Sequence, residues 1–325
     1  MSICSLAAGV CGGISGQAGN SAPEILSISR EYFSQKASSS HVSLALAREH
    51  RVLQGVHNGV MTRWNWKLTV ASALLYALAF NLVFFIQELF LVLPKAFTPG
   101  LRPTLFHNNH TWEGDHPLAK LFQGTGALAT AITAMVCAVL LRRGWGRSAS
   151  ARLFLIWIVY NGLFQSMPQV VIGAFVPAND VGMAMDYFSL SGPFRTAAAV
   201  TALVAMPVVG TLLTRPVLSL AQDAGEIDSA AARAGFTFRL ATLPALLAIP
   251  LIIPFRVPRE WIEVVMVPLV VTVIGVAWMQ VGACLVTNVN ARGSVGAVSV
   301  VRLAGALVAL LLVFQLVLRH GVRFY

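Results

Sequence analysis

Seven apolar runs, each about 19 residues or longer, limit what this chain can fold into more than any other feature. The runs lie near residues 68–93, 119–141, 151–175, 195–214, 237–255, 261–286 and 298–318. Because the bilayer interior offers no water to unpaired backbone groups, runs of this length predict membrane-spanning helices. The chain lacks the short alternating segments of an outer-membrane barrel. We therefore expect an all-α, polytopic transmembrane helical bundle that occupies residues 61–325.

The charge content of the chain supports this class. Charged residues make up 11% of the sequence, against about 25% in soluble proteins. The net charge of +10 comes from short basic clusters between the apolar runs, without interleaved aromatic residues. This pattern is not that of a nucleic-acid-binding surface. The expected partners are the lipid bilayer and other membrane proteins, and no nucleic acid.

The basic clusters also predict an orientation, because Lys and Arg are enriched in short cytoplasmic loops. Two clusters are strongest: Arg48, Arg51, Arg63 and Lys67, and then Arg142, Arg143, Arg147 and Arg152. They predict a cytoplasmic N-terminus, and we expect a bacterial inner membrane. Several basic residues fall on the opposite side and weaken this prediction: Lys95, Arg102, Arg256, Arg259, Arg319 and Arg323.

Two segments depart from the simple helical pattern. The run 237–255 contains Pro244, Pro250 and Pro254, which predict a kinked or re-entrant span. Residues 1–60 are rich in Ser, Ala and Gly and have no sustained apolar period. We expect a disordered N-terminal extension, or else a true start at Met61, where the sequence MTRWNWK is typical of a cytoplasmic anchor.

With spans that alternate across the membrane, unusual polar residues collect on the side opposite the N-terminus. Ionisable groups inside a membrane are costly and often functional. Asn81, Glu88 and Lys95 lie a heptad apart and predict one polar stripe on the first span. The candidate polar cluster or substrate path consists of Asn81, Gln87, Gln165, Gln169, Asn179, Asp180 and Asp186.

Each of these groups has a functional and a structural interpretation. Glu88 fits a proton carrier, a cation ligand or a general base, but also a packing partner for a basic group. The segment HNNHTWEGDHP suggests a zinc site from its histidines with Asp180, or simply a polar surface loop. The candidate metal ligands are His107, His110, His116 and Asp180. Asn179 and Asp180 equally fit the end of the third span and the cap of a short helix through Met185.

The segment Gln87-Glu88-Leu89-Phe90-Leu91, with Asn179-Asp180-Val181-Gly182 downstream, resembles the site-2-protease family of intramembrane zinc metalloproteases. In that family two histidines of HExxH and a later Asp bind zinc, and the Glu activates water. Glu88 matches the general base and Asp180 the later aspartate. Gln87 and Leu91, however, replace both zinc-binding histidines, so the usual zinc site would lose two of its three protein ligands.

The resemblance therefore implies a non-proteolytic relative, a scaffold or interaction subunit that binds or escorts membrane segments. It implies no cofactor, although loop histidines leave zinc open. If the protein is an enzyme after all, Glu88 is the catalytic candidate of a membrane-embedded metallohydrolase. Two further functions stay open: a small proton-coupled transporter or permease with Glu88, Gln165, Gln169 and Asp180 along a polar path, and an accessory subunit of a larger membrane complex.

Overall fold

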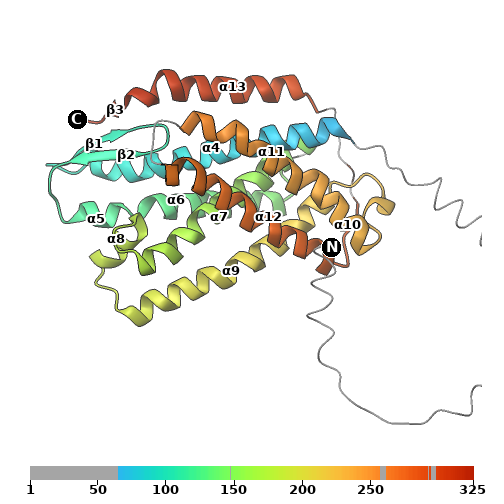
Figure 1. Ribbon diagram of the computed structural model, residues 1–325, viewed down its shortest axis with the longest axis horizontal. Coiled ribbons are helices and arrows are strands. Elements are labelled where there is room, and N and C mark those ends of the chain that lie inside the picture. The colour runs from blue at the N-terminus through green and yellow to red at the C-terminus, as the bar shows by residue number, and fades with distance from the viewer. Residues whose placement is uncertain (1–64, 147, 257–260, 292, 294–297) are drawn as a thin grey trace, which may run out of the picture. The chain divides into compact units, whose positions relative to one another are not determined.

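The structure, a computed structural model, describes residues 65–325 except 147, 257–260, 292 and 294–297. The expected N-terminal extension, residues 1–60, and the alternative start at Met61 lie outside the described residues. Within the described part, seven helical segments are long and apolar enough to cross a membrane. The predicted all-α bundle is therefore confirmed, and the chain is an integral membrane protein by the length and composition of these helices (Figure 1).

The seven segments follow the predicted runs closely. They are α4 (Trp66–Ala96), α5 (Leu118–Phe122) with α6 (Thr125–Arg142), α7 (Ala149–Phe175), α9 (Gly192–Leu218), the composite fifth segment Ala230–Arg256, η4 (Ile262–Met266) with α12 (Val267–Leu285), and α13 (Val300–Leu316) with η5 (Leu318–His320). Two short helices lie between them: α8 (Asp180–Tyr187) and η1 (Ala224–Glu226).

The proline-containing fifth segment, which the sequence predicted to be kinked or re-entrant, is a continuous but irregular helix. It comprises α10 (Ala230–Thr237), the π-helical η2 (Phe238–Thr242), α11 (Leu243–Ile252) and the 3-10 turn η3 (Ile253–Arg256). Two hydroxyl groups of α4 compensate the disturbed backbone: Ser72 Oγ donates to Leu240 O (2.7 Å) and Thr69 Oγ1 to Arg239 O (3.1 Å). Such side-chain donors make an irregular helix tolerable where water is scarce.

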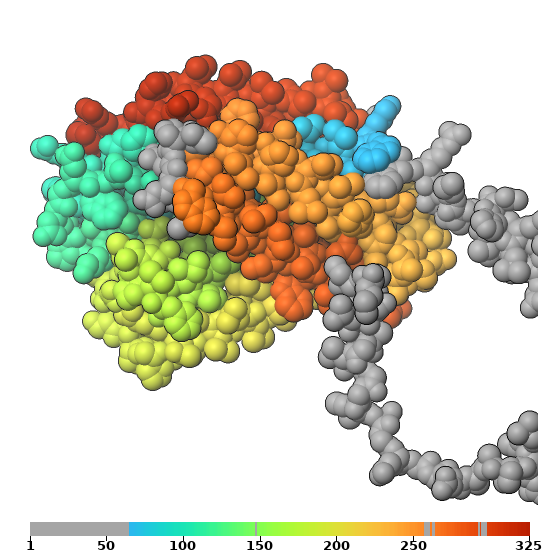
Figure 2. Space-filling model, viewed as in Figure 1, coloured from blue at the N-terminus to red at the C-terminus, as the bar shows by residue number. Residues whose placement is uncertain are grey.

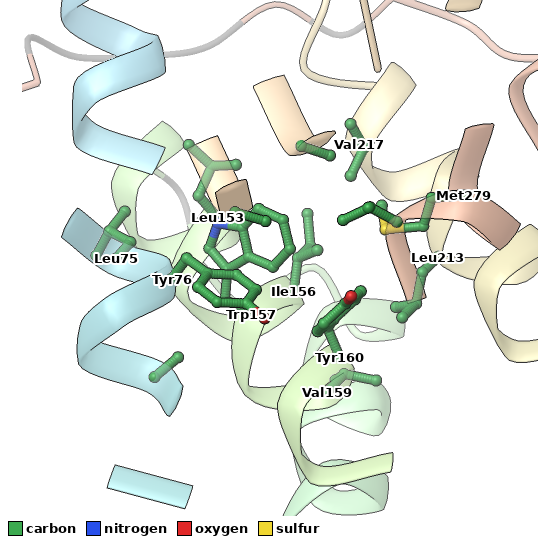
Figure 3. Close-up of a cluster of buried hydrophobic side chains, with 14 of the residues drawn as sticks. Leu75, Tyr76, Leu153, Ile156, Trp157, Val159, Tyr160, Leu213, Val217 and Met279 are labelled. Carbon is green, nitrogen blue, oxygen red and sulfur yellow. The ribbon is translucent and has the colours of Figure 1, made fainter. Parts of the chain in front are cut away.

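Helices α4 and α7 form the centre of the bundle and run side by side in the same direction. Near their starts, Trp157 Nε1 donates to Ser72 Oγ (3.1 Å), and near their ends Gln169 Nε2 donates to Gln87 Oε1 (2.8 Å). The ring of Trp157 also packs edge to face against Tyr76, one turn further along α4, with ring centroids 4.9 Å apart (Figure 3). The C-terminal ends of α4 and α7 therefore lie at the same end of the bundle.

Apolar side chains cover much of the outside of the bundle. Helix α13 buries only Leu307, Leu311 and Phe314 of its apolar side chains, and α9 exposes Leu203, Val204 and Val208. In the space-filling view α13 (red) lies along one edge and α9 (yellow) along the other (Figure 2). Large exposed apolar surfaces of this kind mark contact with lipid or with partner proteins.

A small antiparallel sheet lies at the end of α4, in the order β2-β1-β3. Its strands are β1 (Arg102–Leu105), β2 (His110–Glu113) and β3 (Val322–Arg323). The sequence pattern does not predict this sheet. The hairpin turn spans 106–109, so His107 and His110 do not share a helical turn, and Leu105 pairs with His110 at the start of β2. This pairing carries His110 back over α4.

Candidate functional site

A cavity of about 420 Å³ opens between the C-terminal parts of α4 and α7, η3, the start of α12 and the β1–β2 turn. We call it the polar pocket. Its polar lining residues are Gln87, Glu88, Asn108, Asn109, His110, Gln165, Gln169, Asn179, Asp180 and Arg256. Its apolar lining residues are Phe84, Pro168, Ile172, Met266, Val267, Val270 and Val271. The volume is that of a ligand site, and the lining is more polar than is usual for such sites.

The polar pocket brings together most residues that the sequence singled out. Five members of the expected polar cluster line it, together with the catalytic candidate Glu88: Gln87, Gln165, Gln169, Asn179 and Asp180. They come from α4, from α7 and from the start of α8. The parallel packing of α4 and α7 brings these separate stretches of the chain together. Two members of the cluster, Asn81 and Asp186, do not line the pocket.

Glu88 is buried, with 4% of its surface exposed, and its carboxylate Oε2 lies 2.9 Å from His110 Nδ1. The side chain of Asn109 fixes the backbone of that histidine, because Asn109 Oδ1 accepts from the His110 amide (2.6 Å). The contact satisfies the buried carboxylate with a charge-assisted hydrogen bond when Nδ1 carries the proton. Glu88 therefore has a histidine partner, whereas the structural interpretation of the sequence offered a Lys, an Arg or a backbone donor.

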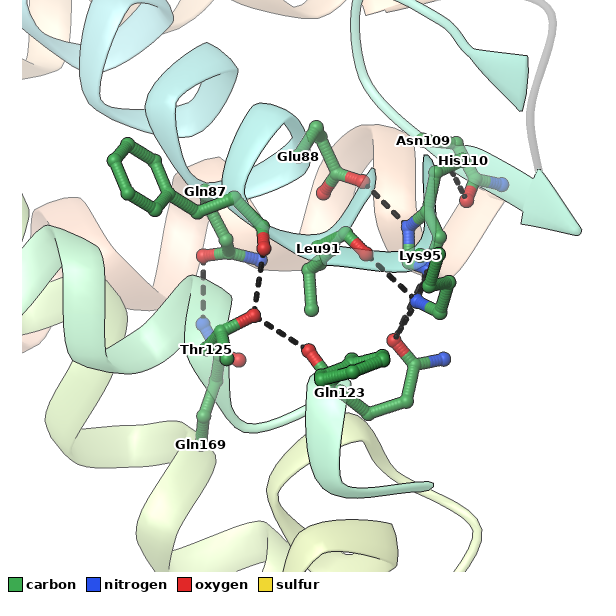
Figure 4. A network of polar contacts seen from close by, with 11 residues as sticks. Gln87, Glu88, Leu91, Lys95, Asn109, His110, Gln123, Thr125 and Gln169 are labelled. Atoms are coloured by element: carbon green, nitrogen blue, oxygen red, sulfur yellow. Dashed lines mark hydrogen bonds and ion pairs between the residues drawn. The ribbon is translucent and has the colours of Figure 1, made fainter. Parts of the chain in front are cut away.

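Lys95 completes this network from the last turn of α4 (Figure 4). It is fully buried, and its Nζ lies within hydrogen-bonding distance of Leu91 O (2.8 Å), Gln123 Oε1 (3.1 Å) and His110 Nε2 (3.3 Å). An ammonium group has three N–H bonds, so these three acceptors match it. The Trp112 ring adds a cation–π contact, with its centroid 4.6 Å from Nζ.

The network selects one tautomer of the His110 imidazole. With Nε2 accepting from Lys95, Nδ1 carries the proton and donates to Glu88. His110 therefore links the Lys95 ammonium group to the Glu88 carboxylate.

Three glutamines link α4 and α7 at the floor of the polar pocket. Gln169 Nε2 donates to Gln87 Oε1 (2.8 Å) and to Gln165 O (3.0 Å). Gln165 is 4% exposed, and its Oε1 is buried without a hydrogen-bond partner in the part of the chain that the structure describes. A buried acceptor of this kind costs about 1–3 kcal/mol when nothing donates to it. Gln165 is therefore the group of the pocket that most needs a donor from a ligand.

Helix α6 packs closely against α4 at Gly126, and this contact positions two side chains of the site. A Cβ atom at Gly126 would lie 2.7 Å from Leu91 Cγ and 2.9 Å from Gln87 Cγ, closer than real carbon atoms pack. Leu91 is fully buried against this glycine, and the Gln87 amide is engaged by Gln169. These two side chains do not fit the ligand positions of an HExxH zinc site.

The other proposed metal ligands have separate surroundings. His107 Nε2 lies 2.8 Å from Phe255 O, and the His116 Nδ1 accepts from the Leu118 amide (3.2 Å) at the start of α5. Neither histidine lines the polar pocket, whereas His110 and Asp180 do. Among the described residues, no three His, Cys, Asp or Glu side chains are arranged to hold a metal ion.

Arg256, at the end of η3, is a member of the site that the sequence analysis did not select. It is 2% exposed, and its guanidinium carbon lies 4.0 Å from the Phe84 ring centroid. Both Arg256 and Lys95 fell on the unfavoured side in the charge pattern, yet both are buried inside the bundle. They are not loop charges, so they do not count against the predicted orientation.

Asn179 and Asp180 also have the structural role that the sequence offered as an alternative. Asn179 is the N-cap of α8, and its Oδ1 accepts from the Val181 amide (3.2 Å). Asp180 lies in the first turn, where a negative charge is favoured by the helix dipole. Asp186 forms an ion pair with Arg195, and Asn81 donates to Ala77 O on its own helix (2.8 Å).

No family model, curated protein or solved structure matches the chain.

Proposed function

We propose that this membrane protein binds a segment of another membrane polypeptide in the polar pocket without cleaving it, as a non-proteolytic relative of the site-2-protease family. The observation that carries the proposal is that Glu88 and Asp180 line one pocket. These are the two residues that the resemblance selects, and their position in one pocket supports it. The intervening helix α7 supplies further polar groups to the same space.

The lining of the polar pocket suits a polypeptide backbone. Six side-chain amides line it, at Gln87, Asn108, Asn109, Gln165, Gln169 and Asn179. Each amide offers donors and an acceptor, as a peptide group does. The buried Oε1 of Gln165 would accept a peptide N–H, and the apolar wall around Ile172 and Val270 would hold the side chains of a membrane segment.

The absence of cleavage rests on the residues at the positions of the family's zinc ligands. Gln is a poor zinc ligand and Leu is none. Gln87 is hydrogen-bonded to Gln169, and Leu91 is packed against Gly126. Glu88, at the position of the general base, is engaged by His110. We therefore assign Glu88 to the structure of the site and to its charge balance.

Site-specific photo-cross-linking tests this proposal. A photoreactive amino acid at Ile172, which lines the pocket and is 46% exposed, should capture a polypeptide in native membranes, and the intact mass of the adduct should be that of a whole protein. The matched control carries the photoreactive group at Val208, a 52% exposed residue of α9 outside the pocket lining. It should capture lipid or nothing.

A pair of glutamine variants makes the test specific. Gln169→Leu removes two hydrogen bonds of the pocket and should lower the yield of the Ile172 adduct several-fold. Gln280→Leu removes a comparable bond outside the pocket lining, from Gln280 Nε2 to Thr242 Oγ1 (2.6 Å). It should leave the yield of the Ile172 adduct unchanged. Equal yields from the two variants, or adducts with shortened polypeptides, would contradict binding without cleavage.

A second candidate is a proton-coupled transporter, favoured by the buried chain of Lys95, His110 and Glu88. Three ionisable groups in hydrogen-bonded sequence, of which His110 and Glu88 line the polar pocket, can pass a proton to a bound solute. Flux of small solutes into proteoliposomes, driven by a proton gradient, would measure it. Transport that depends on the gradient and is lost in Glu88→Gln would favour this function over polypeptide binding, and no flux would exclude it.

A further inference from the structure

A second cavity, of about 300 Å³, lies at the opposite end of α7 from the polar pocket. We call it the basic pocket, lined by Arg152, Arg215, Pro216, Ser219 and the stretch 288–290. Arg152 lies in the first turn of α7 and Gln169 near its end, which separates the two pockets by about 25 Å along the helix. The basic pocket plays no part in the proposed polypeptide binding.

The described lining of the basic pocket carries two positive charges and no carboxylate. Arg152 Nη2 donates to Ser219 Oγ (3.0 Å), and Ser219 Oγ donates in turn to Pro216 O (2.8 Å), so the serine holds the arginine in place. Arg215 comes from the last turn of α9 and is exposed. Two arginines that line one cavity suit an oxyanion, because each guanidinium group can donate two parallel N–H bonds to phosphate.

Apolar surface adjoins the basic pocket. Leu212 lies one turn before Arg215 on the same side of α9 and is 50% exposed. Leu285, the last residue of α12, is 56% exposed and precedes the lining residue Asn288 by three positions. A phosphate that entered this cavity could therefore be joined to chains that lie on apolar helix surface. A free phosphate ion would make no use of that surface.

We propose that the basic pocket binds the phosphate group of an anionic membrane lipid, with its acyl chains against α9 and α12. Arg152 and Arg215 bind the phosphate oxygens, and the side-chain amides of Asn288 and Asn290 donate to the headgroup. Basic pockets between spans, at the membrane surface, recognise anionic lipids in this way. The lipid joins α7, α9 and the chain after α12 at one end of the bundle.

Equilibrium binding of short-chain phosphatidylglycerol to the purified full-length protein, in a neutral detergent, tests the proposal. Arg215→Gln should weaken binding at least about fivefold, the effect of one basic residue at an anionic headgroup. Arg302→Gln is the matched control, because Arg302 is an exposed arginine in the first turn of α13 and does not line the pocket. It should leave the affinity unchanged.

Two further ligands test whether the pocket needs a charged headgroup and a lipid rather than free phosphate. One further variant tests the pocket independently of Arg215. Phosphatidylcholine, which has no net charge, and inorganic phosphate should both bind more weakly than phosphatidylglycerol. Asn290→Ala changes an exposed residue outside the helices and should also weaken phosphatidylglycerol binding, even if Arg215→Gln fails to fold. Equal losses in Arg215→Gln and Arg302→Gln, or inorganic phosphate that binds as tightly as the lipid, would overturn the proposal.

Discussion

The buried charges of Glu88 and Lys95 should stabilise the fold together, and a double-mutant cycle can measure how strongly. Glu88→Gln removes one of two carboxylates that attract the ammonium group of Lys95, the other being Asp180. Lys95→Met leaves three acceptors without their donor. Breaking one partner of a buried charge pair costs about 3–5 kcal/mol. The variant with both substitutions removes both charges of this pair together, and in both Lys95 variants Asp180 loses the same attraction.

The size of the coupling follows from the geometry of the network. His110 lies between the two charges, 2.9 Å from Glu88 Oε2 and 3.3 Å from Lys95 Nζ. With the width of the imidazole ring the charges are about 8 Å apart, and Coulomb's law at an effective dielectric constant of about 20 gives an attraction of about 2 kcal/mol. The double variant should thus lose about 2 kcal/mol less than the two single losses together.

Reversible unfolding of the purified protein in mixed detergent micelles would provide the four free energies. Lys67→Met combined with Glu88→Gln is the control, since Lys67 is an exposed residue at the start of the same helix. That pair should be additive within about 0.5 kcal/mol, as distant sites are. If the losses from Glu88→Gln and Lys95→Met also add within about 0.5 kcal/mol, the charge network is refuted.

Three further outcomes are expected. Gly275→Ala should destabilise the protein by about 1–3 kcal/mol through overpacking, because its methyl group would overlap the buried Tyr160 ring. Gly305→Ala, with open space around it, should leave the stability unchanged. Equal losses of stability in the two variants, measured by thermal unfolding, would refute the close contact at Gly275. Asp186→Asn should cost less than about 1 kcal/mol, since the pair with Arg195 is partly exposed. Chelation of divalent metals should leave the Ile172 adduct unchanged, and a loss of adduct restored by zinc would contradict a zinc-independent site.

The spans were predictable from the sequence because membrane helices must satisfy their own backbone and bury long apolar runs in lipid. All seven expected runs have a matching helical segment. The irregular fifth span was also predictable, since Pro244 and Pro250 lack the amide hydrogen that a helix needs. The three-stranded sheet was not, because strand β3 has only two residues, Val322 and Arg323, and pairs with a strand more than 200 positions earlier.

The site was predictable in part. Gln87, Glu88, Gln165 and Gln169 stood out as polar groups within apolar helices, and such groups face the interior of a bundle. Lys95 appeared on the same stripe as Glu88 but was not selected, although its position in the last turn of a membrane helix was a usable signal. Gln123 and Arg256 lay outside any motif, and only tertiary packing brings them to α4.

The zinc site that the sequence left open would need its histidines close together, and in the described residues they lie apart for a local reason. A hairpin separates the histidines: His110 enters β2 and turns toward Glu88, while His107 stays in the turn and meets the backbone of η3. His116 lies beyond β2, where it binds the start of α5. The geometry of the turn sets the directions of these side chains, and the spacing of the histidines in the sequence does not predict that geometry.

The central claim is that polar side chains of α4 and α7 face one pocket, and chemical cross-linking of paired cysteines tests it most directly. Gln87→Cys with Gln169→Cys should be joined by a short bifunctional thiol reagent in native membranes, with the linked peptides identified by mass spectrometry. Phe85→Cys with Gln169→Cys should not be joined, because Phe85 packs on Phe314 of α13, with ring centroids 5.6 Å apart. Joining of the second pair but not of the first would contradict the account.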